Sequence, residues 1–259
     1  HHVEYGRKLI SEIFDEELAE LATRHHTSSS YGPNERPSKN EQHIISVADH
    51  ISSGSDWPDE SEGGASFQSL PIKLTHILSR GDVVVHESSA TDLEIFPNKF
   101  RSEFKERDVI FEEVFGFLEQ NLTLFPAETR QPNNDVSLWD HLKLTSAIAN
   151  CIWRQGYKGQ YPSRYRFTLL SGDVDHISNY IGKSLRLPDL RARSRRIDKA
   201  TRKATSFVSK NMGVECVIYL GGGSFLALTI PEMAEKLIRG VEEAFLEATG
   251  GQSSITVSG

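Results

Sequence analysis

The sequence contains only two cysteines, Cys151 and Cys216, which lie far apart and lack the short spacing of a metal-binding motif. We expect both to be buried thiols in a reducing cytoplasm. The chain also lacks any apolar run near the roughly 20 residues that a membrane helix needs. Glu4, Arg7 and Lys8 interrupt its start, where a signal peptide would be apolar. These absences predict a cytoplasmic protein with no membrane partner.

An excess of positive charge is also lacking. The 29 lysine and arginine residues are outnumbered by 36 aspartate and glutamate residues, which gives a formal net charge of −7. This balance argues against a protein that coats nucleic acid with its whole surface, although a local basic face stays compatible with it. With 37% hydrophobic residues over 259 positions, the sequence is ordinary for a globular protein and long enough for two domains.

The chain begins with His1 and His2 and has no initial methionine. It could be a mature fragment, it could lack a preceding segment, or the two histidines could remain from a purification tag. Composition does not decide among these three origins.

The first half of the chain predicts helices separated by polar loops. Apolar residues recur at helical spacing over residues 3–26 and again over 41–52. Loops rich in serine and glycine follow both segments. We therefore expect residues 1–80 to form a partial helical domain and residues 81–162 to form a connection into a second domain.

Within the connection, residues 82–86 predict a strand because they hold a run of valines. Residues 99–121 predict one amphipathic helix with its phenylalanines on the buried face. A further helix is expected over residues 136–153, capped by Asp135 or Ser137.

Residues 163–259 carry the clearest pattern, with apolar strands and amphipathic helices in the order βαββαβ. This order is the split βαβ, or ferredoxin-like, arrangement, which nucleotide polymerases and cyclases use as a palm. The expected fold class is therefore α+β, a helical N-terminal domain followed by a ferredoxin-like palm. The strands are expected at residues 165–170, 215–220, 225–230 and 254–257, with a helical region over 176–211 and a helix over 231–249.

Two short segments of this palm predict a nucleotide site. In the first, Gly172, Asp173 and Asp175 stand where the first strand is expected to end, and His176 follows. Carboxylates at i and i+2 of a strand end point in the same direction. The N-terminus of the next helix would offer free N–H groups to a phosphate.

The second segment is the turn between the second and third strands, formed by Gly221, Gly222, Gly223 and Ser224. Glycines there would let a triphosphate approach the backbone. Two-metal nucleotidyl transfer also needs carboxylates that hold Mg²⁺ on the phosphates, and this turn has none. We therefore expect nucleotide binding without catalysis. The alternative is structural, with Asp173 capping a helix and the glycines forming a tight turn.

Histidines and one aspartate predict a metal site in the N-terminal half. His2, His25, His26 and Asp49 occur in helical surroundings, and HD-type phosphohydrolases bind one or two divalent metals with such a set. The alternative is that these are surface histidines at a helix C-terminus, where they favour the helix dipole.

A run of basic residues marks the first long palm helix. It could contact an RNA backbone, the phosphates of ATP or an acidic partner subunit, or it could be a solvated face. Arg193 could instead lock this helix to the palm sheet. The candidates for phosphate contact are Arg191, Arg193, Arg195 and Arg196, and Lys199, Arg202 and Lys203 continue the run.

Four segments match elements that occur together in one family. Residues 136–143 resemble its Val-Ser-Leu-(Tyr/Trp)-Asp-His element, and residues 169–181 resemble its Gly-Asp-(Ile/Val)-Ser-Gly-Ile-Gln-x-Phe-Ile segment. Residues 191–194 resemble its Leu-Arg-(Gly/Ala)-Arg-Ser element, and residues 219–225 resemble its Ala-Gly-Gly-Gly-(Asn/Lys)-Phe hairpin. The family that these elements resemble is the large subunit of type III CRISPR effector complexes, and their order makes the likeness specific.

The resemblance implies two palms per subunit. A second palm with a Gly-Gly-Asp-Asp hairpin makes cyclic oligoadenylate from ATP when target RNA is bound, and the palm seen here would be its non-catalytic partner. The implied partners are other effector subunits, guide RNA, target RNA, single-stranded DNA and ATP. Asp175 and His176 depart from the family, which has Ser-Gly at these positions.

The same resemblance implies an HD domain that cleaves single-stranded DNA with a divalent metal such as Mg²⁺ or Mn²⁺. The family's histidine elements fall on His2, on His25 and His26, and on the segment around Asp49. Its His-Asp dyad should lie before His2. The pair at Asp140 and His141 does not fit that role, so we expect only a partial metal site.

Two other functions stay open from the sequence. One is a regulatory palm that binds a nucleotide and does no chemistry. The other is a free-standing HD-type metal-dependent phosphohydrolase with an unrelated C-terminal domain.

Overall fold

In the computed structural model the chain divides into two compact units, His1–Thr145 and Ser146–Gly259. The boundary near residue 80 that the sequence indicated stays a prediction. The structure describes residues 2–26, 36–54, 66–67, 72–75, 84–88, 90–127, 130–131 and 136–259.

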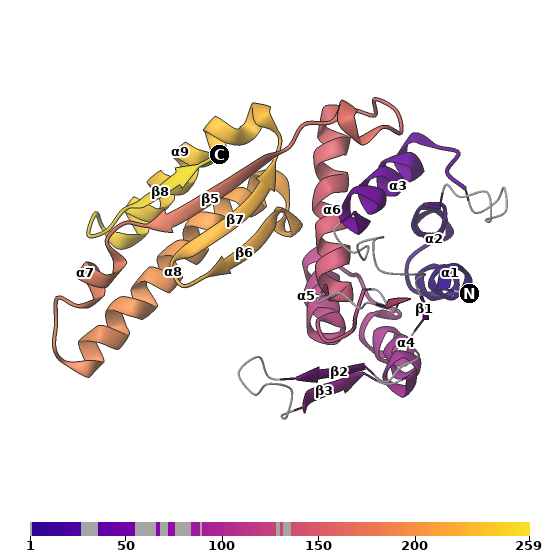
Figure 1. Cartoon of the computed structure of the whole chain (residues 1–259), viewed down its shortest axis with the longest axis horizontal. Helices are drawn as coiled ribbons and strands as arrows, with labels where there is room; N and C mark the ends of the chain where they lie inside the picture. The colour runs from indigo at the N-terminus through magenta and orange to yellow at the C-terminus, as the bar shows by residue number, and fades with distance from the viewer. Residues whose placement is uncertain are drawn as a thin grey trace. The chain divides into compact units, whose positions relative to one another are not determined.

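The N-terminal unit is mainly helical (Figure 1). Two short antiparallel strand pairs accompany the helices, β1 with β4 and β2 with β3. The helices are α1 (His2–Ile13), α2 (Glu16–Thr23), α3 (Asn40–Ser53), α4 (Ala90–Phe104), α5 (Phe111–Leu122) and α6 (Leu138–Gln155), the last of which continues into the second unit. The strands are β1 (Ser66–Phe67), β2 (Ile72–Thr75), β3 (Val84–Ser88) and β4 (Arg130–Gln131). The strand expected at residues 82–86 is thus found from residue 84 onward, and residues 82–83 lie outside the described residues.

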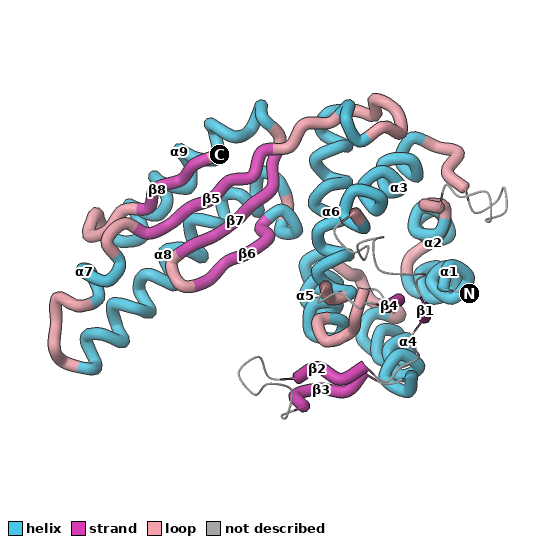
Figure 2. Tube along the Cα trace, in the orientation of Figure 1, coloured by secondary structure: helices cyan, strands magenta, loops and turns pink. Residues whose placement is uncertain are grey.

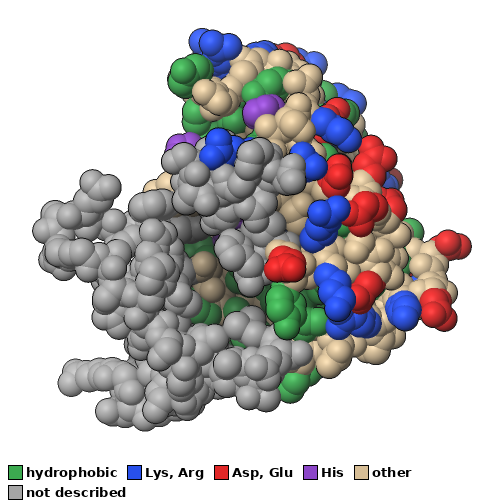
Figure 3. Space-filling model, turned by 90° about the vertical axis from the view of Figure 1, so that its right-hand side faces the viewer, with side chains coloured by type: hydrophobic (Ala, Val, Ile, Leu, Met, Phe, Trp, Pro, Cys, Tyr) green, Lys and Arg blue, Asp and Glu red, His purple; other side chains and the backbone are tan. Residues whose placement is uncertain are grey.

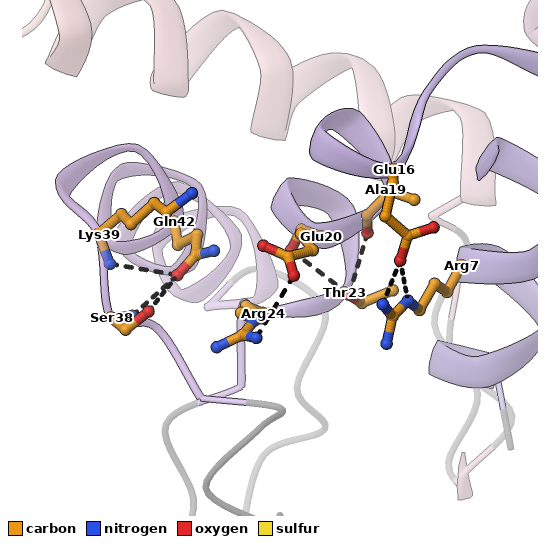
Figure 4. Close-up of polar contacts among 9 residues, drawn as sticks. All are labelled: Arg7, Glu16, Ala19, Glu20, Thr23, Arg24, Ser38, Lys39 and Gln42. Atoms are coloured by element: carbon orange, nitrogen blue, oxygen red, sulfur yellow. Dashed lines mark hydrogen bonds and ion pairs between the residues drawn. The ribbon is translucent and has the colours of Figure 1, made fainter.

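Local polar contacts define where α2 and α3 begin. The Asp15 carboxylate accepts a hydrogen bond from the Leu18 N–H at 2.7 Å, which caps α2 and separates it from α1. At the start of α3, Gln42 is 1% exposed and its Oε1 accepts from the Ser38 N–H at 2.8 Å and the Lys39 N–H at 3.2 Å (Figure 4). The helices expected over residues 3–26 and 41–52 are therefore present, the first of them as two helices.

The single helix predicted over residues 99–121 is wrong, because α4 ends at Phe104 and α5 begins at Phe111. Glu106 between them has φ of 64°, a left-handed conformation that stops a helix. The apolar spacing continues across the break because both helices bury phenylalanines in one cluster. Phe104 is 1% exposed and packs edge-on against Phe117 with ring centroids 5.2 Å apart.

Ion pairs lie on the surface of this unit. Arg101 Nε lies 2.6 Å from Glu12 Oε2, and Arg107 Nη1 lies 3.3 Å from Glu103 Oε1. On the face drawn in Figure 3, the described lysine and arginine side chains lie beside aspartate and glutamate side chains. Exposed pairs of this kind contribute about 0–1 kcal/mol each, so they add little to the stability of this unit.

The expected cap of α6 is confirmed at Ser137, since its hydroxyl accepts a hydrogen bond from the Asp140 N–H at 3.0 Å. Trp139 in the first turn is 4% exposed and packs with Leu122 and Phe125. None of the described helices is long and apolar enough to cross a membrane.

The C-terminal unit holds a four-stranded antiparallel sheet in the order β6-β7-β5-β8 (Figure 2). With the helices of both units, this sheet makes the fold α+β, as expected. The helix α8 packs on β6 and β7, and α9 packs on β5 and β8. The elements are β5 (Thr168–Val174), α7 (Ile177–Ile181), α8 (Leu187–Met212), β6 (Val217–Gly221), β7 (Ser224–Thr229), α9 (Pro231–Thr249) and β8 (Ile255–Ser258).

The first strand lies later in the sequence than predicted, starting at Thr168 rather than Tyr165. The side-chain amide of Gln155 binds the backbone of Arg166 on both sides, accepting from its N–H at 3.1 Å and donating to its C=O at 2.9 Å. These bonds use the groups that a strand would offer to a neighbour. The Tyr165 hydroxyl is likewise engaged, since it donates to the Gly159 carbonyl.

The two faces of the sheet differ. Leu170 and Val174 in β5 are 0% and 2% exposed and face the helices, where Phe245 of α9 is 0% exposed. Leu169 in β5 and Tyr219 in β6 are 52% and 54% exposed on the other face. Each fully buried large side chain contributes roughly 1.5–3 kcal/mol, so the helix-covered face carries the core of this unit.

Candidate functional site

The hairpin between β6 and β7 is a two-residue turn. Gly222 and Gly223 have φ of 63° and 90°, and Gly221 pairs with Ser224 on either side of them. Positive φ at both central residues is the type I′ turn that matches strand twist and favours glycine. The Ser224 hydroxyl donates to the Gly221 carbonyl at 3.1 Å, and the Gly223 carbonyl accepts from the Val174 N–H of β5 at 3.1 Å. The turn geometry alone therefore requires two of the three glycines.

Asp173 lies in the middle of a row of polar side chains across three strands. Its register partners are Ser224 in β7 and Thr256 in β8. Directly opposed residues share one face, with Cβ atoms about 4.5–5.5 Å apart, and Asp173 and Thr256 are exposed. An acidic hairpin residue would have to stand where Ser224 stands to pair with Asp173.

Gly172 and Asp173 lie near the end of β5, which ends at Val174, so the strand ends within the expected segment. Gly172 is buried, and a Cβ there would lie 2.1 Å from the Phe225 ring. The absence of a side chain at Gly172 is therefore explained by packing of Phe225. Its assignment to a nucleotide stays a prediction.

Asp175 comes directly after β5 and is bound to β8. Its carboxylate accepts hydrogen bonds from the Ser254 hydroxyl at 2.6 Å and the Thr256 hydroxyl at 2.8 Å. These two bonds hold the pKa of Asp175 below its usual value. Both carboxylate oxygens of Asp175 are thus engaged, whereas Asp173 faces solvent.

His176 has φ of 51°, which is left-handed and uncommon for a residue other than glycine. It is exposed and precedes α7, which has only five residues. The helical region expected over residues 176–211 is therefore present as two helices, the short α7 and then α8, which begins at Leu187 after a turn. A helix as short as α7 offers a phosphate little of the dipole that we expected there.

In the N-terminal unit, Asp49 in α3 lies next to His141 in α6, with Asp49 Oδ1 and His141 Nε2 3.2 Å apart. Burial raises the pKa of Asp49, but the hydrogen bond from His141 and the charges of His25 and His26 outweigh it, so the pKa is lowered overall. The rings of His25 and His26 lie with their centroids 4.0 Å apart and their planes tilted by 46°. The structure therefore places Asp49 in contact with His141, with His25 and His26 near enough for their charges to act on Asp49.

This arrangement has suitable donor chemistry for a divalent transition metal, because imidazole and carboxylate are its usual ligands. Among the residues that the structure describes, however, no three such side chains are grouped closely enough to hold a metal ion. His2 lies in α1, and its side chain is outside the described residues. The metal site therefore stays a prediction, and no chemical step is derived through it.

The sequence shows the Asp140-His141 pair, but His141 is not among the metal ligands predicted from the sequence. A usable signal was present in the spacing of α6. Thr145 lies four residues after His141, and its hydroxyl is 2.6 Å from that of Ser52, three residues after Asp49. Residues three and four apart share one helix face, so a polar stripe on α6 faces the same side of α3.

The predicted basic residues divide into two kinds. Arg193 Nη1 donates to the Tyr180 carbonyl at 3.0 Å, and its guanidinium lies 5.2 Å from the centre of the Tyr180 ring. Arg193 therefore locks α8 to α7. Arg196 is held by the Gln252 side chain at 3.0 Å. Arg191 and Arg195 are exposed, and a role in binding phosphate stays a prediction for them.

No protein-family model matches the chain. A Cas10/Csm1 single-strand-specific deoxyribonuclease of a subtype III-A CRISPR system from Methanocaldococcus jannaschii is 24% identical over 246 residues, covering 80% of this chain and 30% of that protein. A protein of the same description from Thermococcus onnurineus is 29% identical over 148 residues, covering 50% of this chain and 19% of that protein.

Solved structures agree in fold. Csm1 of T. onnurineus matches 99% of this chain and 40% of its own with a TM-score of 0.69 at 19% identity. A Csm1-Csm4 cassette in complex with AMPPNP matches 99% of this chain and 40% of its own with a TM-score of 0.70 at 19% identity.

These likenesses in sequence and fold show that the chain is homologous to the large subunits of type III CRISPR systems. Within that class, the homology is to the Cas10/Csm1 subunit of subtype III-A systems. The chain spans 30% and 19% of the lengths of the two curated relatives.

Proposed function

We propose that this chain is the N-terminal part of the large subunit of a type III CRISPR RNA-guided antiviral effector and that its C-terminal unit is a ferredoxin-like palm. The sheet order β6-β7-β5-β8 supports this proposal, because it places the third and fourth strands of a βαββαβ unit on either side of the first strand. The two long helices α8 and α9 pack on the same sheet. The other effector subunits, guide RNA and target RNA would be its partners, in the cytoplasm.

The palm binds ATP and does not catalyse its polymerisation. The observation that carries this proposal is Ser224 standing opposite Asp173, where a second carboxylate would complete a metal site. Asp175 does not supply it, because its oxygens already accept bonds from Ser254 and Thr256. One free carboxylate is too few for the two-metal mechanism. Related Csm1-Csm4 cassettes have been solved with one ATP and with cA4, which supports ATP as the ligand class.

Nuclear magnetic resonance of the labelled chain tests this site. Titration with ATP and Mg²⁺ should shift the amide signals of Asp173, Gly222 and Ser224. Gly222→Ala should abolish these shifts, because it adds a methyl group at an open backbone position without filling the core. Asp198→Asn, an exposed acid on α8, is the matched control and should leave them unchanged. Shifts confined to other elements would contradict the proposal.

The N-terminal unit is part of an HD-like domain for metal-dependent cleavage of single-stranded DNA. The contact between Asp49 and His141, with His25 and His26 nearby, supports this role. The description of both curated relatives as single-strand-specific deoxyribonucleases supports the DNA substrate. The same cluster is also the observation that would favour a free-standing HD-type phosphohydrolase, but homology over both units argues against that alternative.

Measurements of metal binding distinguish a metal site from histidines that lie at the surface without binding a metal. Binding of Co²⁺ or Mn²⁺, measured by calorimetry, should weaken at least about tenfold in Asp49→Ala and His141→Ala, because each removes a donor. His50→Ala is the matched control, since His50 is exposed beside Asp49 in α3. Equal metal binding by all three variants would show that Asp49 and His141 only stabilise the contact between α3 and α6.

A further inference from the structure

A basic groove runs between α8 and α9 and takes no part in either site described above. Its volume is about 570 Å³. The charged residues that line it are Arg195, Arg196, Lys199 and Lys203 of α8 and Glu247 of α9. Four cations against one acid contrast with the net charge of −7 for the chain. Average composition therefore does not explain this surface.

Structural roles account for two of the four cations. Arg196 donates to Gln252 Oε1 at 3.0 Å. Lys203 Nζ lies 3.6 Å from Glu247 Oε2, in the last turn of α9, where a cation also offsets the negative end of the helix dipole. Arg195 and Lys199 are exposed and make no hydrogen bond or ion pair within the described part of the chain. These two charges are available to a ligand.

The spacing of the cations fits an extended anion. Arg195, Lys199 and Lys203 follow at i, i+4 and i+8, so they lie on one helix face. At 1.5 Å of rise per residue, neighbours are about 6 Å apart along the axis and the row extends about 12 Å. A row of this length can contact several charges of a polymer, whereas a single phosphate would occupy one end of it.

The apolar lining distinguishes between two classes of polyanion. Besides the charged side chains, the groove is lined by alanines of both helices, Ala192, Ala200 and Ala248. Protein partners are bound through large aromatic or arginine anchors in pockets, and lysine is depleted at such interfaces. Single-stranded nucleic acids are bound by positive grooves that follow the phosphate backbone. An alanine-floored, lysine- and arginine-lined groove favours the nucleic acid.

We propose that the α8–α9 groove binds the phosphate backbone of a single-stranded nucleic acid, with Arg195 and Lys199 as its principal contacts. The groove does not read base sequence, because contacts to phosphates carry no sequence information, and its lining contains no aromatic side chain on which a base could stack. Glu247 at its edge weakens the local field and keeps the binding moderate. This proposal is independent of the nucleotide site, since it concerns the helical layer and not the sheet.

Fluorescence anisotropy with the whole chain tests it. The probes are a labelled mixed-sequence 20-nucleotide RNA and the DNA of the same sequence, at 50–200 mM NaCl. Both strands should bind, with a slope of log affinity against log salt of about −2 to −3 for three or four neutralised phosphates. The affinity of the double variant Arg195→Glu, Lys199→Glu should fall at least about tenfold, and its slope should be shallower by about 1.4.

The control variant is Lys210→Glu, Arg239→Glu. Both residues are exposed on the same two helices and outside the groove, and the change in net charge is identical. Its affinity should stay within about twofold of the parent, and circular dichroism should show both variants folded. Equal losses in the two variants would overturn the proposal, because net charge would explain them. Displacement of the RNA by poly-glutamate at equal charge concentration would also overturn it, in favour of an acidic protein. Binding of only one of the two strands would overturn the backbone-only contact.

Discussion

Each compact unit presents one carboxylate in a different setting. Asp49 of the N-terminal unit is 31% exposed and lies 3.2 Å from the His141 imidazole. Asp173 of the C-terminal unit faces solvent in register with Ser224 and Thr256. Imidazoles beside a carboxylate are chemistry for binding a metal, whereas hydroxyls and glycines beside one are chemistry for hydrogen bonding to a ligand. The difference supports division of labour between a metal-dependent unit and a binding unit.

The comparison also gives a physical reason why the proposed palm would bind a nucleotide without catalysis. The glycines of its hairpin are needed for the turn, and the position opposite Asp173 is occupied by a hydroxyl. The next acid in the sequence, Asp175, accepts hydrogen bonds from Ser254 and Thr256 with its two carboxylate oxygens. A ligand that approaches this hairpin would therefore meet one free carboxylate.

The largest expected effect concerns the hairpin. Gly223→Ala should cost about 2 kcal/mol or more, because φ is 90° and the new Cβ would lie 2.7 Å from Ile177 Cδ1. Gly222→Ala should cost only about 1 kcal/mol, since no atom lies within 4 Å and only the backbone is strained. Urea unfolding followed by circular dichroism compares them. Equal costs would show that packing beneath the hairpin is not what distinguishes the two glycines.

A second change adds a carboxylate to the proposed nucleotide site at the hairpin. Ser224→Asp places a carboxylate opposite Asp173 and should cost up to about 1 kcal/mol at low salt, because like charges face each other across strands. Mg²⁺ or Mn²⁺ should restore the loss, as a thermal-shift assay would show. Ser258→Asp is the matched control, since it faces Ser171 and not an acid. If the metal response is the same in both variants, Asp173 and residue 224 do not form a pair.

The third prediction separates the causes of two lowered pKa values. For Asp49 and Asp175 alike, the folded-state pKa lies below the unfolded one near 3.9. Each carboxylate therefore stabilises the fold above that pH, and the contribution is lost as pH falls through the folded pKa. Asp49→Asn and Asp175→Asn should each reduce the loss of stability between pH 5 and pH 2, by about 1 kcal/mol at most.

The dependence on salt distinguishes the Asp49 contribution to stability from the Asp175 contribution. The Asp49 contribution depends on histidine charges and should shrink in 0.5 M NaCl, whereas the Asp175 contribution depends on the Ser254 and Thr256 hydroxyls and should persist. Urea midpoints at each pH and salt concentration measure this. An Asp49 contribution that does not respond to salt would remove the role assigned to the histidines.

The smallest expected effect is stabilising. His176→Gly should raise the free energy of unfolding by about 0.5–1 kcal/mol, because φ of 51° suits glycine better than histidine. His50→Gly in the exposed interior of α3 is the control and should lower it by about 1 kcal/mol. A loss of stability in His176→Gly would show that the His176 side chain makes a contact worth more than the strain.

Local sequence signals predicted much of the C-terminal unit. Pro231 in the first turn and Gly250 at the end set the bounds of α9, which agree with the prediction, and Gly250 has φ of 61° as a C-terminal cap. The glycine hairpin was likewise visible as a turn. These features depend on residues close in sequence, so a pattern can detect them.

Tertiary contacts account for what the sequence could not show. The start of β5 is delayed because Gln155 occupies the backbone of Arg166, eleven residues away. His141 reaches Asp49 across 92 positions. Such contacts depend on how helices pack, and a helix pattern shows which side is polar without showing what it faces.

Incubation of the purified chain with radiolabelled ATP and Mg²⁺, followed by chromatographic separation of products, tests the central claim most directly. A palm that binds without catalysis predicts that ATP is retained by the chain and recovered unchanged, with no linear or cyclic oligoadenylate. Formation of either product by the 259-residue chain alone would contradict it, because one free carboxylate opposite Ser224 would then suffice for nucleotidyl transfer.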